Sequence, residues 1–387
     1  MTIKIPQFIS DTIKTLENAG FEAYIVGGCV RDILMGITPH DYDITTSALP
    51  HEIKSLFEKT IDTGIKHGTV TVIKENIPIE ITTFRTEGAY SDNRRPDSIE
   101  FVKDLKKDLS RRDFTVNAIC YNENVGFIDL FGGMEDIKNR TLKAVGNPEE
   151  RYKEDALRIL RLYRFAATLN FKIDKKTHDD ALACSSLIKN VSRERIADEL
   201  KKAVLGDNIS ALESLINTNA FDFISVYSCG NLDNILSLQK NTDLRLFSLF
   251  SLCNCDISKV AKELKLSNKT QTYFNIFLKL LSNKIPQNKY EIKEILSFCD
   301  FEIFEEFIEY LWKIKNINCN QIIFLLNEIK SNSEPYKISH LDISGNDIRQ
   351  LGYKEIEIGN ALNLVLQKVL EEPNLNKKET LIKILTK

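Results

Sequence analysis

Hydrophobic and polar positions alternate along residues 22–130 of the chain. Short runs rich in β-branched and aromatic residues recur there between turn-forming residues, which is typical of strands with one buried face. We predict strands at 23–26, 41–45, 69–73, 79–84, 99–102 and 126–130. The polar residues Lys74, Glu75 and Asn76 separate two of these runs, so residues 69–84 should form a β-hairpin.

The pattern changes beyond Arg151. Apolar residues then recur at three- and four-residue spacing, which predicts long amphipathic helices in place of strands. The expected fold class is an α/β head, with a small mixed sheet and flanking helices, followed by an all-α remainder. Changes of pattern and a linker-like stretch after Ser331 divide the chain into residues 1–138, 139–204, 205–330 and 331–387.

Composition limits the function classes. With 52 Lys and Arg against 55 Asp and Glu, the 387-residue chain has no overall positive field, so RNA could be bound only by local basic patches. Candidate patches are Arg94-Arg95, Arg111-Arg112, the trio Arg158, Arg161 and Arg164, and Lys201-Lys202. The eight cysteines form no C-x-x-C pair and are expected to be reduced thiols. No apolar run reaches 18 residues and no signal-peptide pattern opens the chain, so we expect a cytoplasmic protein without a membrane partner.

Two carboxylates, Asp41 and Asp43, are the first candidates for chemistry. In a strand over 41–45 their side chains would share one face, because alternate strand residues point the same way. Paired carboxylate oxygens suit Mg²⁺, with substrate phosphates completing its shell. Upstream, Gly27 and Gly28 allow close backbone approach at the start of a predicted helix, whose N–H groups can bind phosphate. This combination suggests nucleotidyl transfer, although D-x-D and G-G pairs are also common in surface loops and turns.

Glu80 lies in the second strand of the predicted hairpin. A third carboxylate from a neighbouring strand is what a two-metal site needs to hold both ions. The alternative is that Glu80 is an ordinary solvent-facing strand residue.

Two further charged motifs follow. Arg111, Arg112 and Asp113 stand at an expected helix start and could bind phosphate and ribose hydroxyls, or they could be a solvated run of charges. Farther on, the motif 154–158 (E-D-A-L-R) has helical spacing. Its two acids and its arginine would share one helix face, either as a recognition site or as a plain ion pair.

Together these motifs resemble a known family. In order along residues 21–200 the chain contains G-G-x-V-R-D, D-x-D, I-E-I-T-T-F-R, R-R-D-F-T-x-N-A, E-D-x-x-R and S-R-E-R-I. Each is modest alone, but in this order they are similar to the class II tRNA nucleotidyltransferases, the CCA-adding enzymes, which share a superfamily with bacterial poly(A) polymerases. The C-terminal half resembles the family more loosely, mainly at 343–347 (I-S-G-N-D). The family's head, neck, body and tail match the four parts of the chain in order.

The resemblance implies a reaction. The 3′-hydroxyl of a tRNA would attack the α-phosphate of CTP or ATP and release pyrophosphate, assisted by two Mg²⁺ ions at Asp41, Asp43 and Glu80. The residues expected to bind the nucleotide are Gly27, Gly28, Arg31, Arg111, Asp113, Asn117, Glu154, Asp155, Arg158, Arg161 and Arg164. Of these, the two glycines and Arg31 would hold the triphosphate, and the R-R-D motif would contact the sugar with support from Asn117.

Base choice has a physical basis. Cytosine and adenine each present an amino donor beside a ring-nitrogen acceptor, whereas uracil and guanine present a carbonyl and a ring N–H. A carboxylate paired with a guanidinium accepts the first pattern and rejects the second, since the wrong base leaves buried charged groups unpaired. Asp155 and Arg158 have this chemistry. The resemblance implies that they act as a protein template, with Glu154 fixing the arginine.

Several alternatives stay open within the family. Residues 87–97 resemble a loop that helps the family switch from C to A addition, which argues against a CC-only enzyme and leaves A-only addition possible. His67 occupies a position where poly(A) polymerases differ, and a structural role is expected for it. An A-adding enzyme, a poly(A) polymerase and an inert tRNA-binding relative are the alternatives, the last being disfavoured because both Asp41 and Asp43 are present. The oligomeric state is left open between monomer and dimer.

Overall fold

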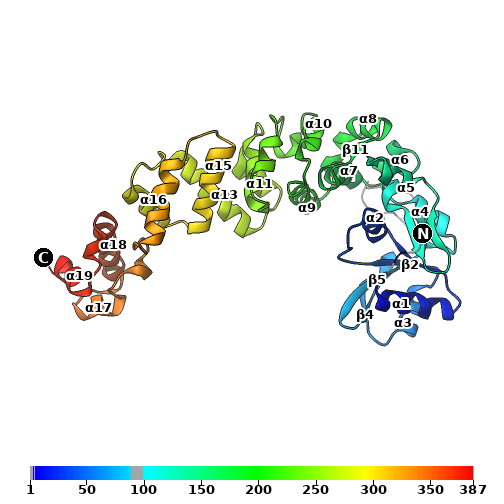
Figure 1. The fold of residues 1–387 in the computed structure, drawn as a ribbon, viewed down its shortest axis with the longest axis horizontal. Helices are drawn as coiled ribbons and strands as arrows, with labels where there is room; N and C mark the ends of the chain where they lie inside the picture. Colours follow the sequence, from blue (N-terminus) through cyan, green and yellow to red (C-terminus); the bar gives the residue numbers. More distant parts are fainter. Residues whose placement is uncertain (1–2, 4, 89–98, 387) are drawn as a thin grey trace. The chain divides into compact units, whose positions relative to one another are not determined.

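The computed structural model describes residue 3, residues 5–88 and residues 99–386. Most of the loop expected over 87–97, including Arg94 and Arg95, therefore lies outside the described residues. The chain divides into two compact units, shown in Figure 1. One unit comprises Met1–Asp233 and Leu252–Lys265, and the other comprises Asn234–Ser251 and Leu266–Lys387.

A seven-stranded mixed sheet forms the core of the first unit. Its strand order is β3-β4-β5-β2-β1-β8-β9, in which only β2 and β5 are parallel neighbours. The strands are β1 Ala23–Val26, β2 Asp43–Thr46, β3 Thr60–Gly64, β4 Thr69–Lys74, β5 Ile77–Thr83, β8 Ile119–Asn122 and β9 Gly126–Asp129. Two separate ladders join β6 Arg85–Glu87 to β7 Ile99–Phe101 and β10 Thr141–Leu142 to β11 Lys172–Ile173.

The predicted hairpin is confirmed: β4 and β5 pair antiparallel through a turn at Glu75 and Asn76, both with positive φ. The strand predicted over 41–45 is wrong at its first two residues. Its neighbour β1 ends at Val26, which pairs with Asp43, so no β1 residue is left to pair with Asp41 or Tyr42.

Eleven described α-helices accompany the sheet in the first unit. They are α1 Gln7–Asn18, α2 Gly28–Leu34, α3 Pro50–Leu56, α4 Leu105–Ser110, α5 Gly133–Lys138, α6 Pro148–Glu154, α7 Leu157–Leu169, α8 Lys175–Ala183, α9 Arg193–Ala203, α10 Glu213–Ile216 and α12 Ile257–Glu263. Helices α1 and α3 lie beside β4 and β5 in Figure 1 and bury Ile9, Leu16 and Ile53. The 3₁₀ turn η1 (Ile65–His67) connects β3 to β4, and the 3₁₀ turn η2 (Thr115–Asn117) lies between α4 and β8.

Two helix predictions are corrected. Arg111 and Asp113 do not open a helix, because α4 ends at Ser110 and Phe114 is extended, bridged to Ala144. Nor do the residues of the E-D-A-L-R motif share one helix. The chain leaves α6 at Asp155, which is extended and whose carboxylate accepts the N–H of Leu157, the first residue of α7.

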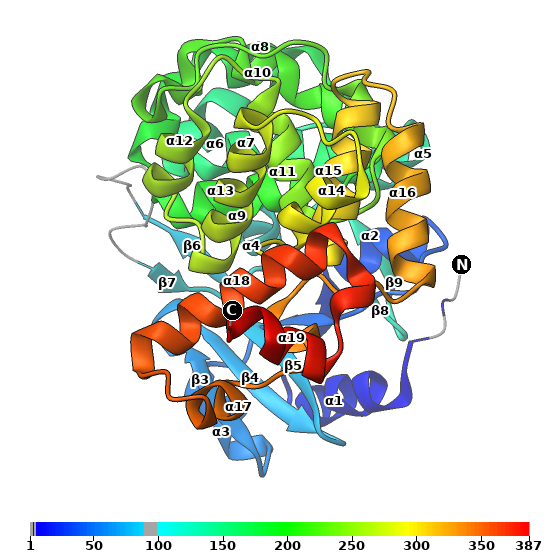
Figure 2. The ribbon, with the colours of Figure 1, turned by 90° about the vertical axis from the view of Figure 1, so that its left-hand side faces the viewer.

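The second unit is helical. Its α-helices are α11 Thr242–Ser251, α13 Asn268–Ser282, α14 Lys289–Leu296, α15 Phe301–Lys313, α16 Asn320–Ser331, α17 Gly345–Gln350, α18 Glu355–Glu371 and α19 Lys378–Leu385. Rings of Phe247, Phe277 and Tyr310 pack within 6 Å of one another in its core. Helices α17, α18 and α19 surround a separate apolar cluster and lie together in Figure 2.

A mixed-sheet head followed by a helical remainder is therefore the fold class, as predicted. The division into four parts is a finer statement and stays a prediction. Within the described ranges, no helix combines the length and the apolarity needed to cross a bilayer.

Gly133 provides a test of how tightly the head is packed. A Cβ there would lie 2.2 Å from the carbonyl oxygen of Thr115, the first residue of η2. We expect Gly133→Ala to lower the free energy of unfolding by about 1–3 kcal/mol, because backbone cannot move aside as a flexible side chain can. Urea titration followed by circular dichroism measures the change.

The matched control is Gly359→Ala in α18, where a Cβ would meet nothing within 4 Å. This substitution should leave stability unchanged or raise it by up to about 1 kcal/mol. Equal effects of the two substitutions would contradict the proposed packing constraint.

Candidate nucleotide-binding site

Three carboxylates gather where β2 begins. Asp43 and Glu80 are register partners on the adjacent parallel strands β2 and β5, and Asp41 lies two residues before Asp43. The pKa of Asp43 is raised to about 6, first by the protein atoms that displace water around it, then by repulsion from Asp41 and Glu80, with Arg112 opposing the rise. All three side chains still reach solvent. The cluster is thus an accessible concentration of negative charge.

A cation would offset that repulsion. Within the part of the chain that the structure describes, no group of three or more His, Cys, Asp and Glu residues is already arranged to hold a metal ion. Mg²⁺ is commonly held by one or two carboxylates, with phosphate oxygens and water completing the shell. Asp41, Asp43 and Glu80 are the carboxylates that could hold such an ion.

Gly27 lies at the turn from β1 into α2. Its φ of +82° favours glycine, and its N–H donates to the carbonyl of Ile119 at 3.3 Å. A Cβ on Gly27 would come within 3.3 Å of a terminal guanidinium nitrogen of Arg112. The missing side chain therefore lets Arg112 lie against the backbone at the entrance to α2, close enough to Asp43 to affect its pKa.

A buried polar chain connects α2 to α7. Arg31 donates to the side-chain oxygen of Asn117 at 2.7 Å, and the Asn117 amide donates to Asp113 at 3.1 Å. Arg161 then pairs with the other Asp113 oxygen at 2.7 Å. Burial alone would raise the pKa of Asp113, but Arg161, Asn117 and the Phe114 N–H lower it to about 2. These predicted nucleotide-binding residues are brought together as one network.

The aromatic ring of Phe165 lies beside three arginines, Arg31, Arg161 and Arg164. Its ring lies 3.4 Å from the guanidinium carbon of Arg164, and 5.3 Å from those of Arg31 and Arg161. Arg164 also donates to the buried carboxylate of Glu199 at 2.8 Å. Neither Phe165 nor Glu199 was predicted, since a single aromatic or acid inside an amphipathic helix looks like ordinary core or surface.

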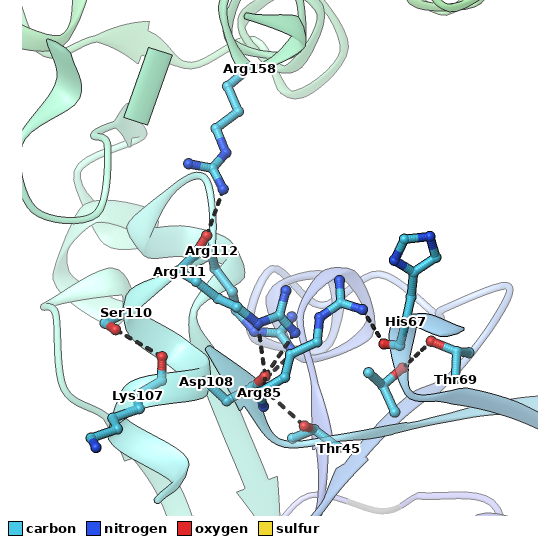
Figure 3. Close-up of polar contacts among 11 residues, drawn as sticks. Thr45, His67, Thr69, Arg85, Lys107, Asp108, Ser110, Arg111, Arg112 and Arg158 are labelled. Carbon is cyan, nitrogen blue, oxygen red and sulfur yellow. Dashed lines mark hydrogen bonds and ion pairs between the residues drawn. The ribbon is translucent and has the colours of Figure 1, made fainter. Parts of the chain in front are cut away.

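Asp108 is a second buried anion of the site, besides Asp113. Its carboxylate has no exposed surface and accepts hydrogen bonds from Arg111 at 2.7 and 3.0 Å, and from Thr45 on β2 at 3.2 Å. Arg112 lies 3.4 Å from the second oxygen, and the Arg85 N–H of β6 donates at 3.3 Å. Figure 3 shows these groups converging on Asp108.

Asp108 was not among the predicted site residues, and Arg112 was predicted only as part of the R-R-D motif and of a basic patch, not in the set expected to bind the nucleotide. Burial favours protonation of Asp108, but the charges of Arg112 and Arg111 outweigh it and lower the pKa of this carboxyl. The only sequence signal for Asp108 is its i,i+3 spacing to Arg111 and its i,i+4 spacing to Arg112. Such spacing is common on helix surfaces.

The E-D-A-L-R motif meets the same cluster. Arg158 is buried and pairs with Glu154 at 2.6 Å, and it donates to the carbonyl of Arg111 at 2.8 Å, as Figure 3 shows. Asp155 pairs instead with Arg195 of the S-R-E-R-I motif, at 3.0 Å. Arg158 and Asp155 thus have different ionic partners. Arg158 is fixed to the head through the Arg111 carbonyl, whereas Asp155 is fixed to α9 (Arg193–Ala203).

The predicted basic trio is not a free positive patch. Arg158, Arg161 and Arg164 are paired with Glu154, Asp113 and Glu199, respectively. His67 lies in η1 with an exposed side chain, and its backbone carbonyl accepts a hydrogen bond from Arg85.

Comparison with known proteins bears on this site. Residues 23–143 match the family described as the poly A polymerase head domain, and residues 170–225 match one described as a probable RNA and SrmB-binding site of polymerase A. A CCA-adding enzyme of Ligilactobacillus salivarius is 37% identical over 391 residues, covering 96% of this chain and 93% of the relative. The chain belongs to the CCA-adding enzymes.

The solved structures agree with this assignment. A CCA-adding enzyme of Bacillus stearothermophilus in complex with CTP has 30% identity and a TM-score of 0.81, covering 97% of this chain and 96% of that one. A Thermotoga maritima CCA-adding enzyme complexed with tRNA has 21% identity and a TM-score of 0.68, covering 99% and 96%, and shares the fold. The predicted membership of the tRNA nucleotidyltransferase and poly(A) polymerase family, and the prediction of an enzyme, are confirmed.

Asp108 can be tested in this CCA-adding enzyme. Asp108→Asn keeps the shape of the side chain but removes the charge that holds Arg111 and Arg112, so we expect a loss of about 2–4 kcal/mol in unfolding free energy. Because the folded state lowers this pKa, the stabilisation is present at neutral pH and fades as the pH falls through the carboxyl range. Urea titrations at pH 7.5 and at pH 3, which is below the usual aspartate pKa of about 3.9, should therefore show a smaller difference at acid pH.

Asp104→Asn is the matched control. Asp104 precedes the same helix and accepts the N–H of Lys106 at 2.9 Å, a capping role that asparagine performs equally well. Its stability should change little at either pH. A pH-independent difference for Asp108→Asn would show that its charge is not what the arginines require.

Proposed function

We propose that this chain adds C, C and A to the 3′ end of tRNA without a nucleic-acid template. The 3′-hydroxyl attacks the α-phosphorus of CTP or ATP, the bond to the bridging oxygen breaks, and pyrophosphate leaves. One observation carries the proposal: an accessible carboxylate cluster at Asp43 and Glu80 adjoins a glycine turn that is lined by Arg112. The relative of known structure that has 30% identity binds CTP.

The carboxylates fit a divalent cation. Asp43 and Glu80 are neighbours on parallel strands, and partial burial, together with repulsion from Asp41 and Glu80, raises the pKa of Asp43 to about 6. Asp41, Asp43 and Glu80 would therefore hold Mg²⁺ together with the phosphates of the nucleotide. When bound, such an ion increases the acidity of a hydroxyl and neutralises charge on a triphosphate.

The other residues of the network bind and orient. Gly27 and Gly28 offer backbone at the start of α2, and Arg112 and Arg31 add positive charge beside it. Asp113 would accept a ribose hydroxyl, since Arg161 and Asn117 keep its carboxylate charged and oriented. These contacts position the α-phosphate and hold the sugar in place while the hydroxyl attacks.

Asp155 and Arg158 would select the base. The Arg195 contact fixes the Asp155 carboxylate, whose oxygens can still accept the amino group of C or A because each has two lone pairs. Glu154 and the Arg111 carbonyl hold the guanidinium of Arg158, which would donate to the ring nitrogen. A guanidinium and a carboxylate that are each held by rigid partners would discriminate against U and G, since the wrong base leaves buried charge unpaired.

The metal site gives a direct test. Asp41→Ala and Asp43→Ala should each reduce nucleotide incorporation at saturating Mg²⁺ by at least about a thousandfold, since several kcal/mol of charge stabilisation are lost. Both proteins should remain folded, because removing one of several repelling carboxylates relieves strain on the fold. Incorporation of labelled CTP into tRNA transcripts that end before the CCA measures the effect.

Asp62→Ala is the control, since Asp62 is an exposed carboxylate of β3 in the same sheet that pairs with Lys54. It should retain near-normal incorporation. Mg²⁺-dependent activity that survives in either Asp41→Ala or Asp43→Ala would refute the metal-site assignment.

Base selection is tested with Arg158→Ala and Asp155→Asn. A base-reading pair is worth about 1–3 kcal/mol, so misincorporation of U and G relative to C should rise by roughly ten- to a hundredfold. Each protein is offered all four nucleotides singly on transcripts ending before CCA, after one C and after CC. Lys153→Ala on α6, where Lys153 is exposed and pairs with Glu149, is the matched control and should keep normal selectivity.

The same transcripts separate the alternatives. An A-only enzyme would act only on the transcript ending in CC, and a poly(A) polymerase would continue past a single A. If selectivity is unchanged while stability and rate fall together, Arg158 and Asp155 merely join α6 and α7.

A further inference from the structure

Two cysteines lie opposite each other in an isolated antiparallel bridge of the first unit. Cys229 and Cys253 are the paired residues. The Gly230 N–H donates to the Leu252 carbonyl at 3.0 Å, and the Asn254 N–H donates to the Ser228 carbonyl at 2.8 Å. These two bonds flank the cysteine pair without involving its own backbone groups, so the pair occupies a non-hydrogen-bonded position of the ladder.

That position brings side chains closest together. Opposed residues there have Cα atoms about 4.5 Å apart, within the range of about 4.4–6.8 Å that a disulfide spans. The Cys253 thiol also hydrogen-bonds to the Cys229 sulfur. Formation of an S–S bond therefore needs little movement of the backbone.

The two sulfurs differ in acidity. The hydrogen bond from Cys253 lowers the pKa of Cys229, whereas the pKa values of the other seven cysteines are raised, chiefly by burial or, at Cys253, by the same hydrogen bond. The thiolate is the reactive form. Cys229 is thus the nucleophile of the pair, and Cys253 is the thiol that follows.

The pair is held in place and remains accessible. The Cys229 N–H donates to the side-chain oxygen of Asn217 at 2.9 Å, and the Leu232 N–H donates to Glu213 at 2.8 Å, so this segment is anchored on both sides of Gly230. Both cysteines are half-buried rather than enclosed. A small oxidant can reach them, and the fixed backbone keeps the second sulfur within reach.

We propose that Cys229 and Cys253 form a thiol–disulfide modification site that reacts with low-molecular-weight disulfides. The Cys229 thiolate attacks one sulfur of the oxidant, whose S–S bond breaks and releases one thiolate. Cys253 then loses its proton and attacks the Cys229 sulfur, which releases the second thiolate. The protein loses two electrons and two protons, and the oxidant becomes two thiols.

The bond would connect two chain segments at a unit boundary. The chain passes into the second unit after Asp233 and returns at Leu252, so a bond between 229 and 253 closes a loop that contains Asn234–Ser251. The bond therefore fixes the beginning and the end of this inserted segment relative to each other. In a reducing compartment such a bond forms when the oxidant concentration rises and is reversed afterwards.

Oxidised glutathione with the full-length protein tests the site. Wild-type protein should lose two of its eight thiols, and peptide mapping should join Cys229 to Cys253, with full recovery after dithiothreitol. Cys253→Ser should stop at a stable mixed disulfide on Cys229. Cys229→Ser should form no intramolecular bond and react about tenfold more slowly, since its remaining thiols have raised pKa values.

Cys255→Ser is the matched control, two residues along the same segment, with a thiol whose pKa burial raises to about 11. It should oxidise as the wild-type protein does. A bond between Cys253 and Cys255, equal rates for Cys229→Ser and wild type, or retention of all eight thiols would each overturn the proposal.

Discussion

The candidate site holds several like charges close together, and its stability depends on opposite charges that offset their repulsion. Five arginines, Arg31, Arg111, Arg112, Arg158 and Arg161, are collected around a small volume next to three carboxylates that are themselves in mutual repulsion. Buried anions make this possible: Asp108 pairs with Arg111 and Arg112, and Asp113 pairs with Arg161 of α7. A buried charge is costly unless it is paired, so each of these anions fixes the position of its arginines. The site is therefore preorganised before any substrate arrives.

Much of the architecture could be predicted from sequence. Short runs of β-branched and aromatic residues predicted the β4–β5 hairpin and most strands of the head, including β1, whose four residues are all buried. Strand β8 was missed because its sequence, I-C-Y-N, has one β-branched residue and ends in the turn former Asn, although all four residues are buried. Strand β3 was missed because it is mostly exposed and its sequence, T-I-D-T-G, contains Asp and Gly, which are depleted in strands. Residue type therefore identifies strands built from typical strand formers and misses strands that contain turn formers.

Most residues of the site could be predicted from the sequence, but the contacts among them could not. Motif order identified the family and brought Asp41, Asp43 and Glu80 into consideration, and the structure makes Asp43 and Glu80 register partners. The helix ends near Arg111 and Asp155 were wrong. Phe114 forms a bridge to Ala144, a contact distant in sequence, and the Asp155 carboxylate accepts the Leu157 N–H, a local contact that helical spacing does not reveal. Asp108 and Phe165 were not predicted because each also has a partner distant in sequence, Thr45 and Arg31 respectively, beside its local arginines.

The parallel pairing of β2 with β5 has a consequence for synthesis. Parallel strands cannot be joined by a tight turn, and here α3, β3 and β4 intervene between the two carboxylate-bearing strands. As the chain emerges from the ribosome, Asp43 has no partner on β5 until the 37 further residues that end at Glu80 have been made and the intervening β3–β4 hairpin has docked. Non-local pairings of this kind form slowly, since chain entropy must be lost first. A nascent or truncated head would thus be unable to assemble its acidic cluster, which delays any metal-dependent chemistry until the domain is whole.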